Sequence, residues 1–367
     1  MNKLRVMYIL RDFPQLSHTY EKNEIEAVKD ECDIRIIAMK RPNISYKNHV
    51  PFSYISNLGM IREAIEEFRP HVLHSHYLDQ THILAKLSSQ TNVPFTIRAH
   101  SFDTIWPGKK SSLFDYIRLP GRDFIPHVIR KGMPSINDDL CLGILSFPFT
   151  RPTLERAGIR SEKIYDCYPV VNYRLFHDRS PNGQAIMNTG ACIPKKKMED
   201  FIRLATLVPN MEFNLYAIGY KLGKISRLNK SVGSPVNIIP PIEPEDMPRE
   251  YKKHRWLVYT ASHKLKTVGW PMAVAEAQAS GVGVCMPNLR PDLREYVGDA
   301  GFLYNSISEV VDIISRPFPE EKRQIGFEHA RKSDIFEHKV ILTSLWRKAI
   351  TSNYNGKNLM EKVSGNT

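Results

Sequence analysis

The sequence predicts an α/β protein made of two doubly wound domains that face a central cleft. Strand-sized apolar runs alternate with helix-like stretches in both halves of the chain, as in βαβ units with a parallel sheet. A polar segment with Pro and Gly, 176–183, interrupts the pattern after one domain's worth of residues. The length of 367 residues also suits two ordinary domains. In such sheets, ligands bind beyond the carboxyl ends of the strands.

The first half alternates strands rich in β-branched and apolar residues with helices. The predicted strands are 4–10, 34–38, 72–73, 94–98, 140–145 and 163–170, and the predicted helices are 19–30, 61–68, 80–90 and 152–157. The stretch 106–134 holds several prolines and glycines among mixed charges, and we expect loops and short helices there.

The second half repeats this architecture without a detectable sequence repeat. The predicted strands are 185–189, 211–218, 236–240, 256–259 and 282–286, and the predicted helices are 198–207, 271–280 and 319–350. The polar tail 353–367 is predicted to be disordered.

Composition limits the class of protein. The apolar runs are strand-sized, whereas a membrane-spanning helix needs about 20 apolar residues. The first run ends at Arg11 and Asp12, too soon for a signal peptide, so we expect a soluble, cytoplasmic protein. The five cysteines are scattered, with no CxxC pair, which argues against a disulfide framework or a zinc site.

The formal net charge is +12, and the basic residues are spread along the chain with only short clusters. The sequence contains no recognisable nucleic-acid-binding signature. The charge therefore favours an acidic substrate, or peripheral contact with the anionic inner face of a membrane, over nucleic acid. A solvated, mildly basic surface would also account for it.

The segment 267–281 carries the strongest chemical signal. Pro271 suits the first position of a helix, and Gly281 can close that helix. Gly269 allows close backbone approach to a ligand at the helix N-terminus, where free N–H groups attract anions such as diphosphate. Glu276 is the only charge in the helix. Taken alone, it could equally be a partly exposed carboxylate on an ordinary helix.

This segment resembles the donor-binding motif of family 4 (group 1) glycosyltransferases, Glu-Gly-Phe-Gly, four residues, Glu-Ala-Met-Ala-x-Gly. Here it reads Val268-Gly269-Trp270-Pro271, four residues, then Glu276-Ala-Gln-Ala-Ser-Gly. The family has the GT-B fold of two Rossmann-like domains. The resemblance implies that Val268, Gly269 and Trp270 belong to the donor site and that Glu276 binds the ribose hydroxyls. The first Glu of the motif contacts the transferred sugar, and Val268 replaces it here.

A second segment, 189–202, resembles the family's Gly-Arg-Leu-x-x-x-Lys-Gly stretch. The resemblance places Gly190 in the donor site and gives Lys196 the role of the phosphate-binding lysine. The arginine of the pattern is Ala191 here, and Lys195 or Lys197 is expected to compensate. Without the resemblance, the three lysines could be a solvated turn before a helix.

In the first half, 13–25 resembles the Phe-Pro-x-x-Ser-Glu-Thr-Phe opening of a polysaccharide-assembly branch of the family. Ser17 or Thr19 is the expected N-cap. Together with Arg11, the N-terminus of this helix is expected to contact a phosphate or the acceptor. The family's donor-site histidine corresponds to His100, which could otherwise be a core histidine.

We also considered a metal site at His71, His74 and His76. His74 and His76 would share one side of a strand. Apart from Asp79, the sequence places no carboxylate or cysteine at ligand spacing, so we predict no metal site.

The resemblance implies an N-terminal, acceptor-side domain at 1–178 and a nucleotide-sugar-binding domain at 179–335. A C-terminal helix at 336–352 would cross back to the first domain. The implied function is retaining transfer of a sugar from a UDP- or GDP-sugar to a glycan or lipid-linked acceptor, in polysaccharide assembly and without a cofactor. Lys196, Glu276 and His100 are the catalytic candidates. Two alternatives remain: a GT-B nucleotide-sugar epimerase, and a non-catalytic GT-B protein that binds a partner transferase or a glycan.

Overall fold

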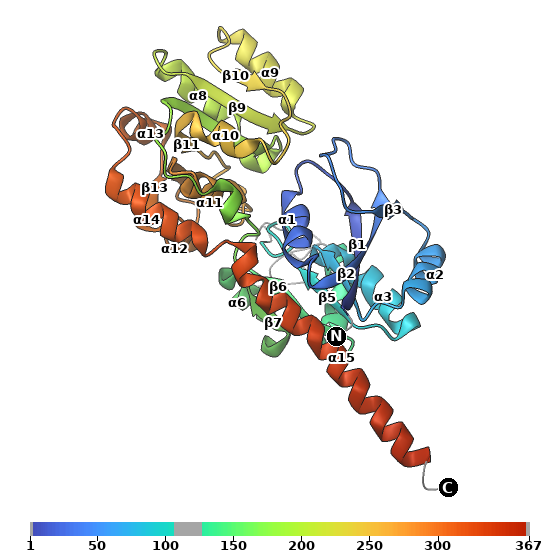
Figure 1. The fold of residues 1–367 in the computed structure, drawn as a ribbon. Coiled ribbons are helices and arrows are strands. Elements are labelled where there is room, and N and C mark those ends of the chain that lie inside the picture. The colour runs from blue at the N-terminus through green and yellow to red at the C-terminus, as the bar shows by residue number, and fades with distance from the viewer. Residues whose placement is uncertain (1–2, 106–126, 365–367) are drawn as a thin grey trace, which may run out of the picture. The chain divides into compact units, whose positions relative to one another are not determined.

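The computed structural model describes residues 3–105 and 127–364, with side chains at 3–105 and 129–350. The chain forms two compact units (Figure 1). Unit 1 consists of Met1–Tyr168 and Glu337–Thr367, and unit 2 consists of Pro169–Phe336. This division falls earlier in the chain than the boundary at 178 that the sequence indicated, and the functional domain limits stay a prediction. Most of the irregular stretch expected at 106–134 lies outside the described residues.

Unit 1 contains a parallel sheet of seven strands in the order β3-β2-β1-β4-β5-β6-β7. The strands are β1 (Leu4–Asp12), β2 (Cys32–Lys40), β3 (Phe52–Tyr54), β4 (Val72–His76), β5 (Phe95–Arg98), β6 (Cys141–Ser146) and β7 (Ile164–Asp166). The strand order changes direction between β1 and β4, which makes this pair the topological switch point of a doubly wound sheet.

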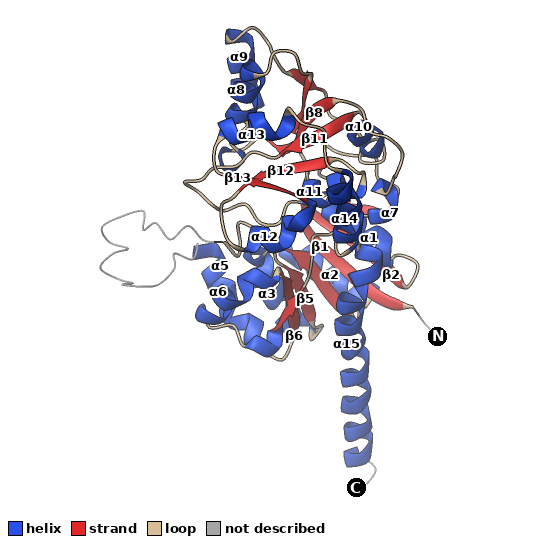
Figure 2. Cartoon of the chain, turned by 90° about the vertical axis from the view of Figure 1, so that its left-hand side faces the viewer, coloured by secondary structure: helices blue, strands red, loops and turns tan. Residues whose placement is uncertain are grey.

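Helices cover both faces of this sheet (Figure 2). They are α1 (Thr19–Val28), α2 (Leu58–Phe68), α3 (Thr81–Thr91), α5 (His127–Gly132), α6 (Arg151–Arg156) and α15 (Ile335–Ser364). Strand β1 separates two cores, because successive side chains of a strand point to opposite faces. Met7 and Ile9 pack with α2 and α3, whereas Tyr8 packs with α1 and with Trp346 of α15.

Helix α15 packs on unit 1 through the residues that follow Phe336. The indole N–H of Trp346 donates to Thr96 Oγ1 at 2.9 Å, and Lys339 Nζ donates to the carbonyl of Ala27 at 2.7 Å. The helix continues to Ser364, through most of the tail that the sequence analysis expects to be disordered. That tail contains several residues with good helix propensity, which overall polarity does not reveal.

Unit 2 contains a parallel sheet of six strands in the order β10-β9-β8-β11-β12-β13. The strands are β8 (Ala185–Ala191), β9 (Phe213–Ile218), β10 (Asn237–Ile239), β11 (His254–Val258), β12 (Gly283–Pro287) and β13 (Gly301–Tyr304). The switch point lies between β8 and β11. The sequence prediction of two doubly wound, Rossmann-like domains is confirmed.

The helices of unit 2 also lie on both faces of its sheet (Figure 2). They are α7 (Tyr173–Phe176), α8 (Glu199–Leu207), α9 (Leu222–Ser231), α10 (Met247–Lys252), α11 (Met272–Ala279), α12 (Asp292–Val297), α13 (Ile307–Ile314) and α14 (Glu320–Arg331). The sequence analysis missed α7, α9, α10, α12 and α13, and also the strands β3 and β13. These elements are short, and several begin beside proline or glycine, so periodicity alone does not reveal them.

We expect Trp346→Ala to lower the free energy of unfolding by about 3–5 kcal/mol, since it empties a fully buried aromatic site. Chemical denaturation followed by circular dichroism measures the change. Val340→Ala on the same helix is the matched control: Val340 is 55% exposed, and we expect a change within about 0.5 kcal/mol. Equal effects of the two substitutions would contradict the packing of α15 on unit 1.

Candidate functional site

The switch point of unit 2 gathers polar groups from the segments that follow β8 and β11. The hydroxyl of Thr260 donates to the carbonyl of Lys196 at 2.8 Å and accepts from the amide of Asn188 at 2.9 Å. The backbone N–H of Ser262 donates to the carbonyl of Lys195 at 2.9 Å. These bonds fix the lysine turn at the carboxyl end of the sheet, where doubly wound proteins bind ligands.

The Lys196 side chain lies against an aromatic ring and beside a glycine. Its Nζ lies 4.3 Å from the centroid of the Tyr259 ring, a cation–π arrangement. A Cβ at position 190 would lie 3.0 Å from this Nζ, and Gly190 has φ +128°, so the site requires glycine there. Burial, followed by the charge of Lys195, lowers the pKa of Lys196 to about 7, although the carboxylate of Glu276 acts in the opposite direction.

Glu276 projects from α11, and the hydroxyl of Tyr251 donates to its Oε2 at 2.8 Å. Burial raises the pKa of Glu276 to about 7, and the Tyr251 hydrogen bond and the charge of Lys196 offset that rise only in part. The helix closes as predicted: Gly281 has φ +70°, its N–H donates to Gln278, and the N–H of Val282 donates to Ala277. Glu276 and Lys196 are thus two coupled, incompletely paired charges.

The loop before α11 is fixed by hydrogen bonds from residues outside the motif. Arg290 Nη1 donates to the carbonyl of Val268 at 2.6 Å, and its guanidinium pairs with Asp292. Asp292 accepts from the indole N–H of Trp270 at 3.0 Å, and Trp270 stacks on Tyr296 with ring centroids 5.0 Å apart. The Val268 side chain is only 4% exposed. The apolar residue at the family's sugar-contact position therefore belongs to the core.

Two details of this loop refine the sequence analysis. Pro271 is the N-cap of α11 and Met272 is the first helical residue, so the prolyl position is shifted by one from the predicted one. Gly269 is buried between Val268 and Trp270. It lies directly before the first turn of α11, whose leading N–H groups have no partner within the helix.

The flanking lysines differ in their contacts. Lys195 Nζ donates to the carbonyl of Thr267 at 3.4 Å, which ties the lysine turn to the loop before α11. Lys197 has a left-handed backbone, with φ +44°, and its Nζ pairs with Asp200 at 2.7 Å. Lys197 is thus already paired with Asp200, whereas Lys195 adds positive charge beside Lys196.

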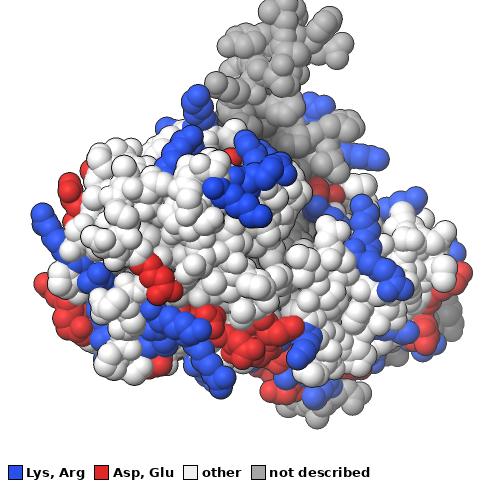
Figure 3. Space-filling model, turned by 90° about the horizontal axis from the view of Figure 1, so that it is seen from above, with Lys and Arg blue, Asp and Glu red and all other residues white. Residues whose placement is uncertain are grey.

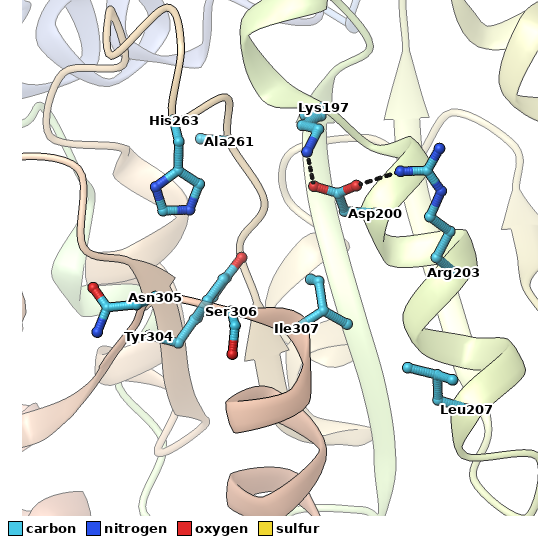
Figure 4. A pocket seen from close by; sticks show the side chains of 10 residues that line it. All are labelled: Lys197, Asp200, Arg203, Leu207, Ala261, His263, Tyr304, Asn305, Ser306 and Ile307. Carbon is cyan, nitrogen blue, oxygen red and sulfur yellow. Dashed lines mark hydrogen bonds and ion pairs between the residues drawn. The ribbon is translucent and has the colours of Figure 1, made fainter.

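Lys197 lines a separate cavity of about 450 Å³ in unit 2 (Figure 4). Asp200 lies between Lys197 and Arg203 and pairs with both cations. The lining residues are Lys197, Asp200, Arg203, Leu207, Ala261, His263, Tyr304, Asn305, Ser306 and Ile307. Of the residues that the sequence analysis considers for the donor site, Lys197 is the one that lines this cavity.

In unit 1, polar residues at the end of β1 and after β4 meet at that sheet's switch point. Arg11 pairs with Asp79 at 2.7 Å, and its guanidinium lies 5.3 Å from the centroid of the Tyr77 ring. Ser17 accepts a hydrogen bond from the Gln15 amide at 3.3 Å. The N-cap prediction is wrong: His18 occupies that position of α1, and no side chain caps the helix.

A buried ionic cluster lies behind this edge. Glu24 of α1 contacts Nε2 of His74 at 2.9 Å and Nε2 of His76 at 3.3 Å through its Oε1, and its Oε2 accepts from Arg98 Nε. Tyr8 OH also donates to Oε1, at 3.2 Å. Burial alone would raise the pKa of Glu24, but Arg98 and the two histidines outweigh it and hold that pKa well below its usual range.

Glu24, His74 and His76 are also the residues whose spacing could hold a metal ion, with ligand atoms within 4.8 Å of one another. The sequence analysis overlooked Glu24 because it lies far from the histidines along the chain. The set is a poor fit for a cation. Arg98 already neutralises Glu24, and burial lowers the pKa of His74 to about 4, so the group is balanced without an ion.

His100 adjoins this cluster, and its Nε2 lies 2.9 Å from Nδ1 of His76. Its backbone N–H donates to Asp103 at 2.9 Å, and the rings of Tyr20 and Tyr77 lie 4.3 and 4.5 Å from its own, between centroids. Burial, then His76 and Arg98, keep the pKa of His100 well below its usual range, so the ring is neutral near pH 7.

The structure thus brings the predicted unit 2 residues into one neighbourhood and places Arg11, Ser17 and His100 in unit 1. Sequence reasoning missed the residues that hold them: Tyr251, Tyr259, Arg290, Glu24 and Arg98. Tyr251 and Arg290 lie outside any recognisable motif, and Tyr259, Glu24 and Arg98 lie in family-like segments in which the sequence assigns them no role. Only the three-dimensional contacts reveal them.

Comparisons with known proteins identify the fold. No family model and no curated protein matches the sequence. Sucrose-phosphate synthase from Thermosynechococcus elongatus superposes with a TM-score of 0.74 at 13% identity, covering 95% of this chain and 100% of that one. Anabaena HepE in complex with UDP-glucose gives 0.69 at 12% identity, covering 96% and 100%. The lipopolysaccharide outer core galactosyltransferase WaaB gives 0.57 at 11% identity, covering 95% and 100%.

The chain therefore has the GT-B fold of these glycosyltransferases, as the sequence analysis predicted. Identities of 11 to 13% establish the fold alone. The function has to be argued from the chemistry of the site.

We expect the Lys196 amine to titrate with a midpoint near pH 7 in the ligand-free protein, because burial destabilises its ammonium form. Glu276→Gln removes the one carboxylate that favours the ammonium form and should move the midpoint lower. Asp200→Asn, which changes the partner of Lys197, should leave it in place. NMR of isotopically labelled, reductively methylated lysines measures this midpoint in the unmodified protein and in both variants. A higher midpoint in Glu276→Gln would refute the coupling.

Proposed function

We propose that the protein is a retaining glycosyltransferase. It would move a sugar from a UDP- or GDP-sugar to a glycan or lipid-linked acceptor in surface polysaccharide assembly. The observation that carries the proposal is a half-buried lysine and a half-buried glutamate, Lys196 and Glu276, that influence each other's pKa at the switch point of unit 2. The GT-B fold, shared with HepE in complex with UDP-glucose, supports a nucleotide-sugar donor.

The two charges suit the two halves of a nucleoside diphosphate. Breaking the sugar–diphosphate bond leaves negative charge on the departing group, and the Lys196 ammonium would stabilise it. Glu276, fixed by Tyr251, would accept hydrogen bonds from the ribose hydroxyls. A bound diphosphate would also supply the counter-charge that Lys196 lacks. No divalent cation is needed for this arrangement.

The residues that would contact the sugar part of the donor are less well defined than those for the nucleotide. Val268 offers no side-chain contact because it is buried, so we assign the sugar or its reacting face to His100. The resemblance to family 4 supports a retaining transfer. Front-face attack by the acceptor would achieve it without a nucleophilic carboxylate.

The proposal also covers the acceptor and the possibility of contact with a membrane surface. Within the described residues, none of the helices combines the length and apolarity needed to cross a bilayer. On the face shown in Figure 3, Lys and Arg side chains gather in several small groups, interspersed with Asp and Glu. That distribution gives no particular support to peripheral membrane contact, which stays a prediction from the net charge alone.

We expect the correct nucleotide to stabilise the protein by about 2.7 kcal/mol at 100 times its dissociation constant. Lys196→Ala and Glu276→Ala should each lose most of this stabilisation and most of the transfer activity. Lys197→Ala is the matched control, since Lys197 is paired with Asp200 and should bind nucleotide normally. A thermal-shift screen with UDP, GDP, ADP and their sugars, followed by turnover assays, makes the measurement.

The same assays separate the alternatives. Conversion of the sugar with donor alone would identify an epimerase. Tight nucleotide binding without hydrolysis or transfer would identify a non-catalytic binding protein. Full activity in both alanine variants would refute the proposed site.

We expect the affinity for the nucleotide sugar to peak near pH 7. Above that pH, the free protein holds Lys196 as a neutral amine, and a proton must be taken up to bind diphosphate, so affinity falls by up to about tenfold per unit. Below it, Glu276 is protonated, and binding ribose through a carboxylate requires a proton to leave. The phosphates of a nucleotide sugar stay fully ionised in this range.

Isothermal titration across pH tests this profile. Glu276→Gln should remove the acid limb and move the alkaline limb to lower pH, because the carboxylate that supports the Lys196 ammonium is gone. A profile that is flat from acid to alkaline pH in the unmodified protein would contradict the assignment of both groups.

A further inference from the structure

The cluster behind His100 contains a chain of contacts from a carboxylate to two imidazole rings. Glu24 is fully buried and paired with Arg98, and its pKa is held well below the usual range, so it is an anion that can only accept hydrogen bonds. Its Oε1 faces Nε2 of both His74 and His76. Neither ring nitrogen meets the geometry of a hydrogen bond to the carboxylate, so it is the negative charge opposite that favours their protonated, N–H form.

The bonding of His74 is compatible with this assignment. Trp346 can only donate, so Thr96 Oγ1 accepts from the indole N–H at 2.9 Å. The hydroxyl hydrogen of Thr96 is then available to His74 Nδ1, 2.7 Å away. In the Nε2–H tautomer that the charge of Glu24 favours, His74 Nδ1 accepts this hydrogen and the ring proton faces Glu24.

The same reasoning continues to His100 through His76. With the proton of His76 on Nε2, its Nδ1 carries a lone pair. His100 Nε2 lies 2.9 Å from His76 Nδ1, so His100 must supply the hydrogen of this bond. A neutral imidazole has one N–H, so Nδ1 of His100 is left unprotonated. Among the residues that the structure describes, none forms a hydrogen bond with that Nδ1.

His100 also has little freedom to leave this orientation. Asp103 accepts its backbone N–H, and Thr104 Oγ1 donates to its carbonyl. Tyr20 and Tyr77 contact the ring, and their two hydroxyl groups are hydrogen-bonded to each other. A ring flip would break the bond to His76 and displace two packed aromatic rings.

We infer that Glu24 and His76 are positioning residues that fix the tautomer of His100, so that its Nδ1 is presented to the ligand as a hydrogen-bond acceptor. The matching ligand group is a donor, a sugar or acceptor hydroxyl, and not a phosphate oxygen. This assignment of the ligand rests on the proposed function. The carboxylate–imidazole–imidazole chain itself does not.

A metal ion at the same three residues would give the opposite tautomer. An ion bound to Nε2 of His76 would leave the ring proton on Nδ1, which would then donate to His100 Nε2. The proton of His100 would move to Nδ1, and His100 would become a donor to its ligand. The tautomer of one histidine thus separates the two interpretations.

Long-range proton–nitrogen NMR of the full chain, labelled in its histidine rings, reads the tautomers directly, and His100→Gln assigns the signals. We expect the Nε2–H form for His74, His76 and His100 in the unmodified protein. An Nδ1–H form of His100, or one equivalent of tightly bound zinc by elemental analysis, would overturn the inference. This measurement needs no variant to fold and no activity.

A matched pair of variants tests the chain of contacts. His74→Phe and His76→Phe each remove one histidine from Glu24 and each bury a phenyl ring, but only His76→Phe disconnects His100. We expect His100 to keep its tautomer in the first variant and to become a mixture in the second. An unchanged tautomer in a folded His76→Phe protein would refute the role of His76.

Turnover then tests the ligand. We expect kcat/KM to fall at least tenfold further in His76→Phe than in His74→Phe, and equal values would refute the acceptor role of His100. If the tautomers are as inferred and the protein transfers no sugar under any condition, the proposed function fails while the chain of contacts stands.

Discussion

The parallel pairing of every strand decides where chemistry can occur in this molecule. In both sheets all carboxyl ends share one edge, and the strand order reverses once, between β1 and β4 in unit 1 and between β8 and β11 in unit 2. Segments distant in sequence must meet at those two points. The lysine turn and the Tyr259–Thr260 segment meet at one, and Arg11 and Asp79 at the other.

The charged groups at the two switch points differ in how well their charges are balanced by neighbours. In unit 1, Glu24 is surrounded by Arg98, two histidines and a tyrosine, and the carboxylate stays ionised despite complete burial. In unit 2, the pKa values of Lys196 and Glu276 are both displaced to about 7, because neither has enough partners to offset its desolvation. The Glu24 carboxylate is stabilised by the cation beside it, whereas the Lys196 and Glu276 charges gain from a ligand that brings the missing charge and donors.

The sequence predicted the fold well because strong periodicity and one polar break define two doubly wound halves. It also singled out Lys196 and Glu276 as site candidates, because their segments carry glycine and proline signals for tight turns and helix ends and resemble family motifs. It failed where contacts are non-local. Tyr251 and Arg290 have no motif, and Glu24 meets His74 only because α1 packs beside β4. It also failed at the start of α1, where His18 and not Ser17 precedes the helix.

Val268 shows how the departure from the family pattern is accommodated. Its side chain is buried, its carbonyl is bound by Arg290, and Asp292 links that arginine to Trp270. A glutamate in this conformation would be an unpaired buried charge, which costs several kcal/mol by typical estimates. The loop is therefore built for an apolar residue, and the missing carboxylate is part of a consistent packing arrangement. Under the proposed function, recognition of the sugar would have to come from groups other than residue 268, and His100 is the residue that we propose for it.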